Sequence, residues 1–117
     1  MGNKFSHLDN KGDAKIVDIS EKEKSSRYAK AYATVWLSKN IVTMIKNDQF
    51  KKGNVLNVAR IAGIIGAKQT STLIPLCHNI TLDSIEINFR FRVEELEIEG
   101  IVQSEQKTGV EMEALTA

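Results

Sequence analysis

Alternation of apolar and polar residues along the chain predicts its strands. Residues 32–37 (YATVWL) are aromatic and β-branched and alternate between two faces. Residues 81–92 carry apolar side chains at every second position in their second half, which is the pattern of a half-buried strand. A shorter strand is predicted at residues 14–19 (AKIVDI). The charge-rich residues 20–30 are expected to form a solvent-exposed connector.

Residues 96–103 are predicted to pair with residues 81–92 as an antiparallel hairpin. Placing Arg92 opposite Glu97 brings opposite charges together on the polar face of the pair. The apolar face is then free to pack against helices. Gly100 marks either a bulge or a point of close approach in the second strand.

Apolar residues at helical spacing predict two helices in the middle of the chain. Ser38 is the expected N-cap of the first, which ends near residues 47–48. Asn54 is the expected N-cap of the second, which runs to about Ser71, and Pro75 cannot continue it. One face of this second helix carries only small residues, which favours close approach to a neighbouring element: Ala59, Ala62, Gly63, Gly66 and Ala67.

A third helix is predicted near the end of the sequence, because Thr108 and Glu111 have the spacing of a capping box. The order of the predicted elements favours one α+β domain over residues 1–117. Its antiparallel sheet would have the helices packed on one face, since each amphipathic element must bury its apolar side against another.

The overall composition excludes several classes of protein. The net charge of +1 argues against a nucleic-acid-binding protein with a broadly basic surface, so any anion site must be local. One cysteine cannot form an internal disulfide, which fits a reducing cytoplasm. No apolar run reaches the roughly 20 residues of a membrane helix. Residues 1–6 match the short myristoylation pattern, but no polybasic cluster supplies the second signal that stable anchoring needs.

The residues that could carry chemistry lie near the ends of the predicted helices. Cys77 and His78 follow Pro75, and a metal site there would need further ligands at a recognised spacing, which the sequence lacks. Cys77 is best explained as a small buried side chain. For His78, a structural hydrogen bond and a hydrogen bond to a substrate are equally consistent with the sequence.

Two lysines, Lys52 and Lys107, each come just before a glycine and the start of a helix. Free backbone amides beside a lysine can bind an anion, and two such places suggest a ligand with phosphates, although exposed lysines beside turns are also common. Glu111 is expected to cap its helix. That leaves Glu113 freer for acid–base chemistry or for accepting N–H groups of a ligand.

Three stretches of the chain resemble the cyclic pyranopterin monophosphate synthase family of molybdenum cofactor biosynthesis. They are FSHLDNKGDAKIVDIS, KGNVLNVARIAGIIGAKQTSTLIPLCHNITL and KTGVEMEALTA. The resemblance implies a ferredoxin-like fold and a cytoplasmic hexamer built from dimers, with the site at a subunit interface. The implied lyase-type reaction converts 3',8-cyclo-7,8-dihydroguanosine triphosphate to cyclic pyranopterin monophosphate and releases pyrophosphate, with no cofactor, metal, nucleic acid or membrane involved.

The resemblance also implies which residues of this chain form the site. Lys52 and Glu111 would be catalytic. The residues implied to bind substrate are Leu76, Cys77, His78, Met112, Glu113, Arg27 and Lys68, with the basic side chains, including Lys52, on the triphosphate.

Two features depart from the family pattern. Asn79 stands where the family usually has a proline after Cys-His, which is expected to loosen that loop. The family's chain continues past Ala117 to a catalytic aspartate and further lysines, so residues 1–117 are expected to lack its C-terminal part. A polypeptide that ended there would be expected to fold poorly or to bind substrate without turnover. The alternative function is therefore a catalytically inactive subunit or a purine-nucleotide-binding module.

Overall fold

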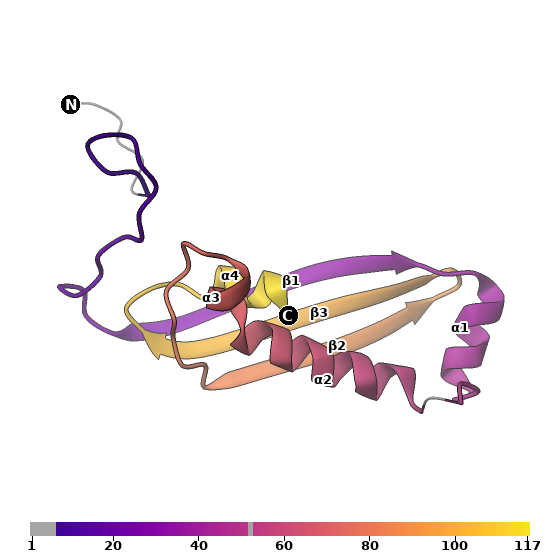
Figure 1. Cartoon of the computed structure of the whole chain (residues 1–117). Coiled ribbons are helices and arrows are strands. Elements are labelled where there is room, and N and C mark those ends of the chain that lie inside the picture. Colours follow the sequence, from indigo (N-terminus) through magenta and orange to yellow (C-terminus); the bar gives the residue numbers. More distant parts are fainter. Residues whose placement is uncertain (1–6, 52) are drawn as a thin grey trace.

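A three-stranded antiparallel sheet runs along the molecule (Figure 1). The computed structural model describes residues 7–51 and 53–117, so the predictions for residues 1–6 and for Lys52 lie outside the described residues. The strands are β1 (Ser25–Trp36), β2 (Ser84–Arg92) and β3 (Glu95–Gln106), in the order β1-β3-β2. The helices are α1 (Lys39–Lys46), α2 (Val55–Lys68), α3 (Thr70–Leu73) and α4 (Glu111–Thr116).

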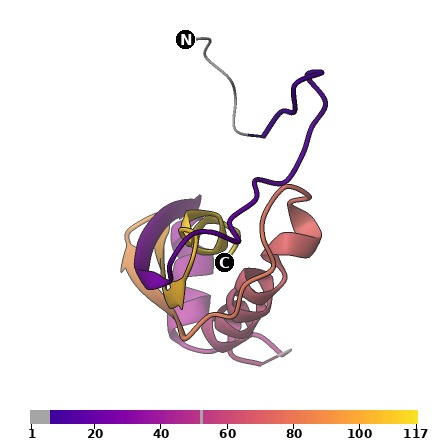
Figure 2. The ribbon, with the colours of Figure 1, turned by 90° about the vertical axis from the view of Figure 1, so that its left-hand side faces the viewer.

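Helices cover one face of the sheet, as the end-on view in Figure 2 shows. α2 packs on β2, and α4 packs on β1 and β3. The buried cluster between them contains Val102 of β3, Val110 and Ala114. The predicted α+β class, with an antiparallel sheet and helices on one face, is confirmed and is consistent with a ferredoxin-like fold.

β1 is longer than predicted, because it begins at Ser25 inside the expected connector. The charged residues of this part hid an alternation in which Ala29 and Ala31 pack against the core while Tyr28 and Lys30 face solvent. Small inward side chains leave room for α4 above the strand. The connector prediction is therefore correct only for its first half.

The strand predicted at residues 14–19 is wrong. Ala14 forms an isolated bridge with Leu8, and residues 15–19 have no regular secondary structure. The Val17 carbonyl accepts a hydrogen bond from the His78 side chain rather than from a neighbouring strand.

The predicted hairpin forms, but its register differs by two residues. Arg92 pairs with Glu95 rather than with Glu97. The predicted register would have left residues 93–96 in the loop, whereas the observed loop is residues 93–94, and two-residue loops match the twist of antiparallel strands. A shift of two residues keeps every side chain on its predicted face. Arg92 still reaches Glu97 diagonally, with 3.3 Å between Nη2 and Oε2.

Both predicted N-caps are confirmed. The Ser38 hydroxyl accepts a hydrogen bond from the backbone N–H of Ile41 at 3.2 Å, and the Asn54 side chain accepts one from Asn57 at 2.9 Å. These bonds satisfy backbone donors that an α-helix leaves free in its first turn. α2 ends at Lys68, and the short α3 continues the chain toward the loop before β2.

The small-residue face of α2 makes the predicted close approach. A Cβ added at Gly66 would lie 3.0 Å from the Thr116 carbonyl oxygen, and one added at Gly63 would lie 3.2 Å from the Ile87 side chain. Gly100 of β3 likewise meets the Ala114 carbonyl, with 3.1 Å to an added Cβ. The glycines therefore allow α4 to settle between α2 and β3, which places the start of α4 beside the loop after α3.

Candidate functional site

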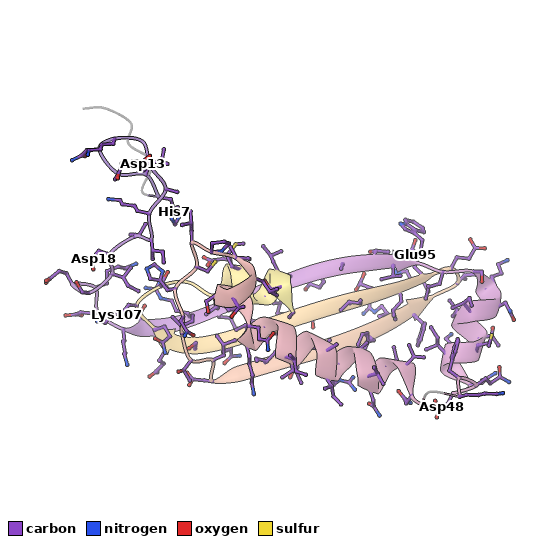
Figure 3. The ribbon with its side chains drawn as sticks, viewed as in Figure 1. His7, Asp13, Asp18, Asp48, Glu95 and Lys107 are labelled. Atoms are coloured by element: carbon purple, nitrogen blue, oxygen red, sulfur yellow. The ribbon has the colours of Figure 1, made fainter. Side chains whose placement is uncertain are left out.

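Three separate parts of the chain enclose a cavity of about 480 Å³ at one end of the sheet. Figure 3 labels His7, Asp18 and Lys107 at this end of the molecule and Asp48 at the other end. The loop after α3, the start of α4 and residues 7–22, called the N-terminal segment below, each supply part of the wall. The lining residues are His7, Val17, Ile19, Lys22, Ile74, Leu76, Cys77, His78, Thr108, Gly109, Glu111, Met112 and Glu113.

Residues 76–78 and residues 111–113, which the sequence analysis proposed as site residues, both line this cavity. Residues 76–78 reach it because Pro75 ends the helical stretch and the chain then turns toward β2. Residues 111–113 reach it as the first turn of α4. Residues far apart in sequence therefore line the same concave site, which is the common arrangement for small-molecule sites.

The predicted capping box at the start of α4 is wrong. The helix begins at Glu111 with Val110 as its N-cap residue and no side-chain cap hydrogen bond. The Glu111 carboxylate lies over Gly109 instead. Its exposed side chain is consequently turned to the cavity wall rather than being used by the helix end.

Among the described residues, Arg27 and Lys68 do not line the cavity. The Arg27 guanidinium donates hydrogen bonds to the carbonyls of Gln106 and Lys107, both at 3.3 Å, so it braces the loop that leads to α4. Lys68 is exposed in the last turn of α2. Their predicted contacts with phosphate stay predictions, as does the role of Lys52, which is outside the described residues.

His78 is held by the N-terminal segment. Its Nε2 lies 2.5 Å from the Val17 carbonyl oxygen. A carbonyl oxygen can only accept, so Nε2 carries the proton in this bond. Nδ1 is then the ring nitrogen left for a ligand. His78 can therefore serve both roles that the sequence left open. Nε2 makes the structural hydrogen bond, and Nδ1 is available for a hydrogen bond to substrate.

Burial changes the acid–base behaviour of two cavity residues. Glu113 is 5% exposed, and burial, together with the negative charge of Glu111, raises the pKa of its carboxyl group. Burial and the charge of Glu113 raise the pKa of the Cys77 thiol, which keeps it protonated and poorly nucleophilic. Glu113 therefore holds a proton more readily than an exposed glutamate does, which suits a carboxyl group that exchanges protons with a ligand.

Comparison with known proteins identifies the family. The model of the MoaC family matches residues 16–117. The chain belongs to the MoaC family. This confirms the resemblance seen in the sequence motifs.

Several curated relatives carry the name cyclic pyranopterin monophosphate synthase. The protein of Peptoclostridium acidaminophilum is 45% identical over 113 residues, which cover 97% of this chain and 72% of the relative. That of Natranaerobius thermophilus is 47% identical over 118 residues, covering 99% and 74%. That of Clostridium perfringens strain SM101 is 48% identical over 118 residues, covering 99% and 75%.

The N-terminal segment supplies cavity residues that the motifs did not single out: His7, Val17, Ile19 and Lys22. The signal was present, because the stretch FSHLDNKGDAKIVDIS already resembled the family. Its chemistry was missed because residues 14–19 were interpreted as a strand and Lys22 as part of a solvated connector. Thr108 and Gly109 were assigned to a helix start, whereas they form the loop that closes the cavity.

Within residues 7–51 and 53–117, no group of three or more His, Cys, Asp or Glu side chains is placed to hold a metal ion. In the same part of the chain, every helix is too short or too polar to cross a membrane.

Replacing Glu113 with glutamine is expected to raise the melting temperature at about pH 8 and to leave it unchanged at about pH 4. The folded protein holds the pKa above the ordinary value of 4.5, so the native state binds the proton more tightly than the unfolded state does. Stability is therefore lost as pH rises from 4.5 through the raised pKa, and glutamine removes that loss. Thermal unfolding at both pH values measures it, with the exposed Glu105→Gln as control. An equal shift at both pH values would contradict the burial of a charged Glu113.

Proposed function

We propose that this protein is a cyclic pyranopterin monophosphate synthase of molybdenum cofactor biosynthesis. It acts as a lyase on 3',8-cyclo-7,8-dihydroguanosine triphosphate and releases pyrophosphate. It needs no cofactor for this step and works in the cytoplasm as a single-domain subunit of a homo-oligomer, a hexamer built from dimers. The convergence of residues 76–78 and 111–113 on one cavity carries the proposal.

The chemistry of the cavity suits a purine-derived substrate. A volume of about 480 Å³ is within the usual range for small-molecule pockets. Glu113 can accept hydrogen bonds from the N–H groups of a guanine-derived base, and His78 can offer Nδ1 to the substrate. Leu76, Cys77 and Met112 supply the less polar surface on which the ring rests. These five residues are proposed to bind substrate.

Glu111 and Lys52 are proposed as the catalytic residues. The Glu111 carboxylate is exposed at the cavity and can move protons between substrate and solvent. Lys52, with Arg27 and Lys68, is proposed to stabilise the charge of the triphosphate as pyrophosphate leaves.

A second copy of the chain is proposed to complete the site. Lys51 and Gly53 precede the N-terminal end of α2, while the cavity follows its C-terminal end, and a 14-residue helix is about 21 Å long. A lysine from that end of α2 therefore serves the cavity best from another subunit. Large apolar side chains also remain exposed on the described chain, including Trp36 at 75% and Ile61 at 59%. The radius of gyration is 18.1 Å, against about 13 Å for a compact chain of this length. The chain is therefore more extended than a compact monomer, which supports the proposal that another copy packs against it.

Turnover of the cyclised GTP derivative by the purified protein tests the proposed function. Pyrophosphate is measured with a coupled assay and the product by mass spectrometry, and release is expected to disappear in Lys52→Ala. Light scattering after size-exclusion chromatography gives the mass of the oligomer. Tight binding of the substrate without release would favour the alternative, an inactive subunit or purine-nucleotide-binding module. Absence of both binding and release would overturn the proposal.

A further inference from the structure

The segment from Val17 to Lys22 is a fixed wall of the cavity. At its start, the Val17 carbonyl accepts the hydrogen bond from His78. In its middle, the Ser20 carbonyl accepts a hydrogen bond from Lys107 Nζ at 3.3 Å. The first bond ties the segment to the loop after α3, and the second ties it to the loop before α4. The segment is therefore attached to both of the other walls.

A local turn sets the direction of the chain between these attachments. The Asp18 side chain accepts a hydrogen bond from the backbone N–H of Ser20 at 2.9 Å, and the N–H of Lys22 donates to the Ile19 carbonyl at 3.0 Å. This turn brings Ile19 and Lys22 to the cavity surface. The position of Lys22 is therefore fixed by the hydrogen bonds of this turn and of the two attachments on either side of it.

Lys22 is the one lysine or arginine among the described residues that line the cavity. Within residues 7–51 and 53–117, its side chain has no hydrogen-bond or ion-pair partner. The neighbouring cations differ from it in this respect. Arg27 is bonded to backbone carbonyls, and Lys107 is bonded to Ser20.

The charges of the cavity require a cation if its ligand is an anion. Glu111 and Glu113 also line the cavity and would repel phosphate groups when ionised. An unpaired ammonium group loses no existing contact when it binds phosphate. Lys22 is also exposed, so it retains access to a ligand entering from solvent.

We propose that Lys22 binds a phosphate group of the substrate and is a specificity-determining residue of the site. The identity of the substrate rests on the proposed function. That Lys22 binds an anion rests on the residues of the cavity alone. Lys22 adds a substrate contact from the N-terminal segment to those from residues 76–78 and 111–113. In this arrangement the N-terminal segment distinguishes the triphosphate from the same purine compound without phosphates.

Two measurements test Lys22 independently of each other. Inorganic triphosphate is titrated into the protein by calorimetry, and its Kd is expected to rise about tenfold in Lys22→Ala and Lys22→Gln, and less in Lys22→Arg. In the turnover assay the same variants are expected to raise KM about tenfold with a smaller change in kcat. Lys24→Ala is the matched control, because Lys24 carries the same charge, is exposed and lies two residues further on, outside the cavity.

The outcomes separate this inference from the proposed function. If triphosphate binding depends on Lys22 but the cyclised GTP derivative is not converted, the phosphate contact stands and the synthase proposal fails. If conversion occurs and Lys22→Ala matches the wild type, the synthase proposal stands and the Lys22 contact is overturned. Equal losses in Lys22→Ala and Lys24→Ala would show that only general surface charge matters, and would also overturn it. So would a wild-type protein that does not bind triphosphate.

Discussion

Replacing His78 with alanine is expected to lower kcat/KM for pyrophosphate release by about 100-fold or more, equivalent to about 2.7 kcal/mol of transition-state stabilisation. The substitution removes Nδ1 from the cavity and also releases the Val17 carbonyl, so the N-terminal segment loses one of its two attachments and keeps the bond from Lys107 to Ser20. The rate of pyrophosphate release over a range of substrate concentrations measures the effect. Asn79→Ala is the control, because Asn79 is the next residue, is exposed and does not line the cavity.

A second variant separates the two roles of His78. The side-chain amide of His78→Gln can still donate to the Val17 carbonyl, but it has no equivalent of Nδ1. If Nδ1 contacts the substrate, His78→Gln is expected to lose nearly as much activity as His78→Ala while keeping the wild-type melting temperature. Full activity in His78→Gln would show that the histidine only holds the N-terminal segment in place.

Replacing Gly66 with valine is expected to destabilise the fold by about 3 kcal/mol. A Cβ at this position would lie 3.0 Å from the Thr116 carbonyl oxygen, and a backbone atom at the end of α4 cannot move aside as a side chain can. The two further methyl groups of valine would push α4 away from α2 and widen the cavity. Urea unfolding at one fixed protein concentration measures the free energy, since any oligomer would couple stability to concentration.

Gly63→Ala is the matched control for Gly66, because both glycines lie on the same face of α2. The nearest atom to an added Cβ at Gly63 is the end of the Ile87 side chain, at 3.2 Å, and that group can rotate. The gain in helix propensity, about 1 kcal/mol, offsets the crowding. We expect a change close to zero for Gly63→Ala. Equal destabilisation by the two substitutions would contradict the contact between α2 and α4.

The parts of the fold that were predicted correctly are those that depend on residues close together in the sequence. The caps at Ser38 and Asn54 depend on residues three positions apart, and the alternation in residues 81–92 follows from the strand pleat. The glycines at 63 and 66 predicted a close approach because isolated glycines in a helix cost stability unless something packs against them.

The parts that were missed depend on contacts between distant residues. The start of β1 was hidden because its outward side chains are charged while its inward ones are small alanines. Residues 14–19 have the composition of a strand, yet residues 15–19 are irregular, and Val17 is bonded to the His78 side chain, far along the chain, rather than to a strand. Charge pairing could not fix the hairpin register, because the observed pairs Arg92–Glu95 and Arg90–Glu97 are as complementary as the predicted ones, and the preference for a two-residue loop decides between them.

The candidate site was predictable where motifs mark it and not elsewhere. Residues 76–78 and 111–113 were identified from the family resemblance, and the structure brings them to one cavity. The N-terminal stretch also resembled the family, but the sequence did not show that it would form a wall of the cavity. Lys22 belongs to a run of charges, and only its place in the cavity distinguishes it from Lys24.

A structure of the Lys52→Ala protein with the cyclised GTP derivative bound would show where the substrate binds, because this variant is expected to bind substrate without converting it. We expect the purine-derived ring to lie against His78 and Glu113, with a phosphate within hydrogen-bond distance of Lys22 Nζ. A ligand bound anywhere other than this cavity, in a protein saturated with substrate, would contradict this expectation.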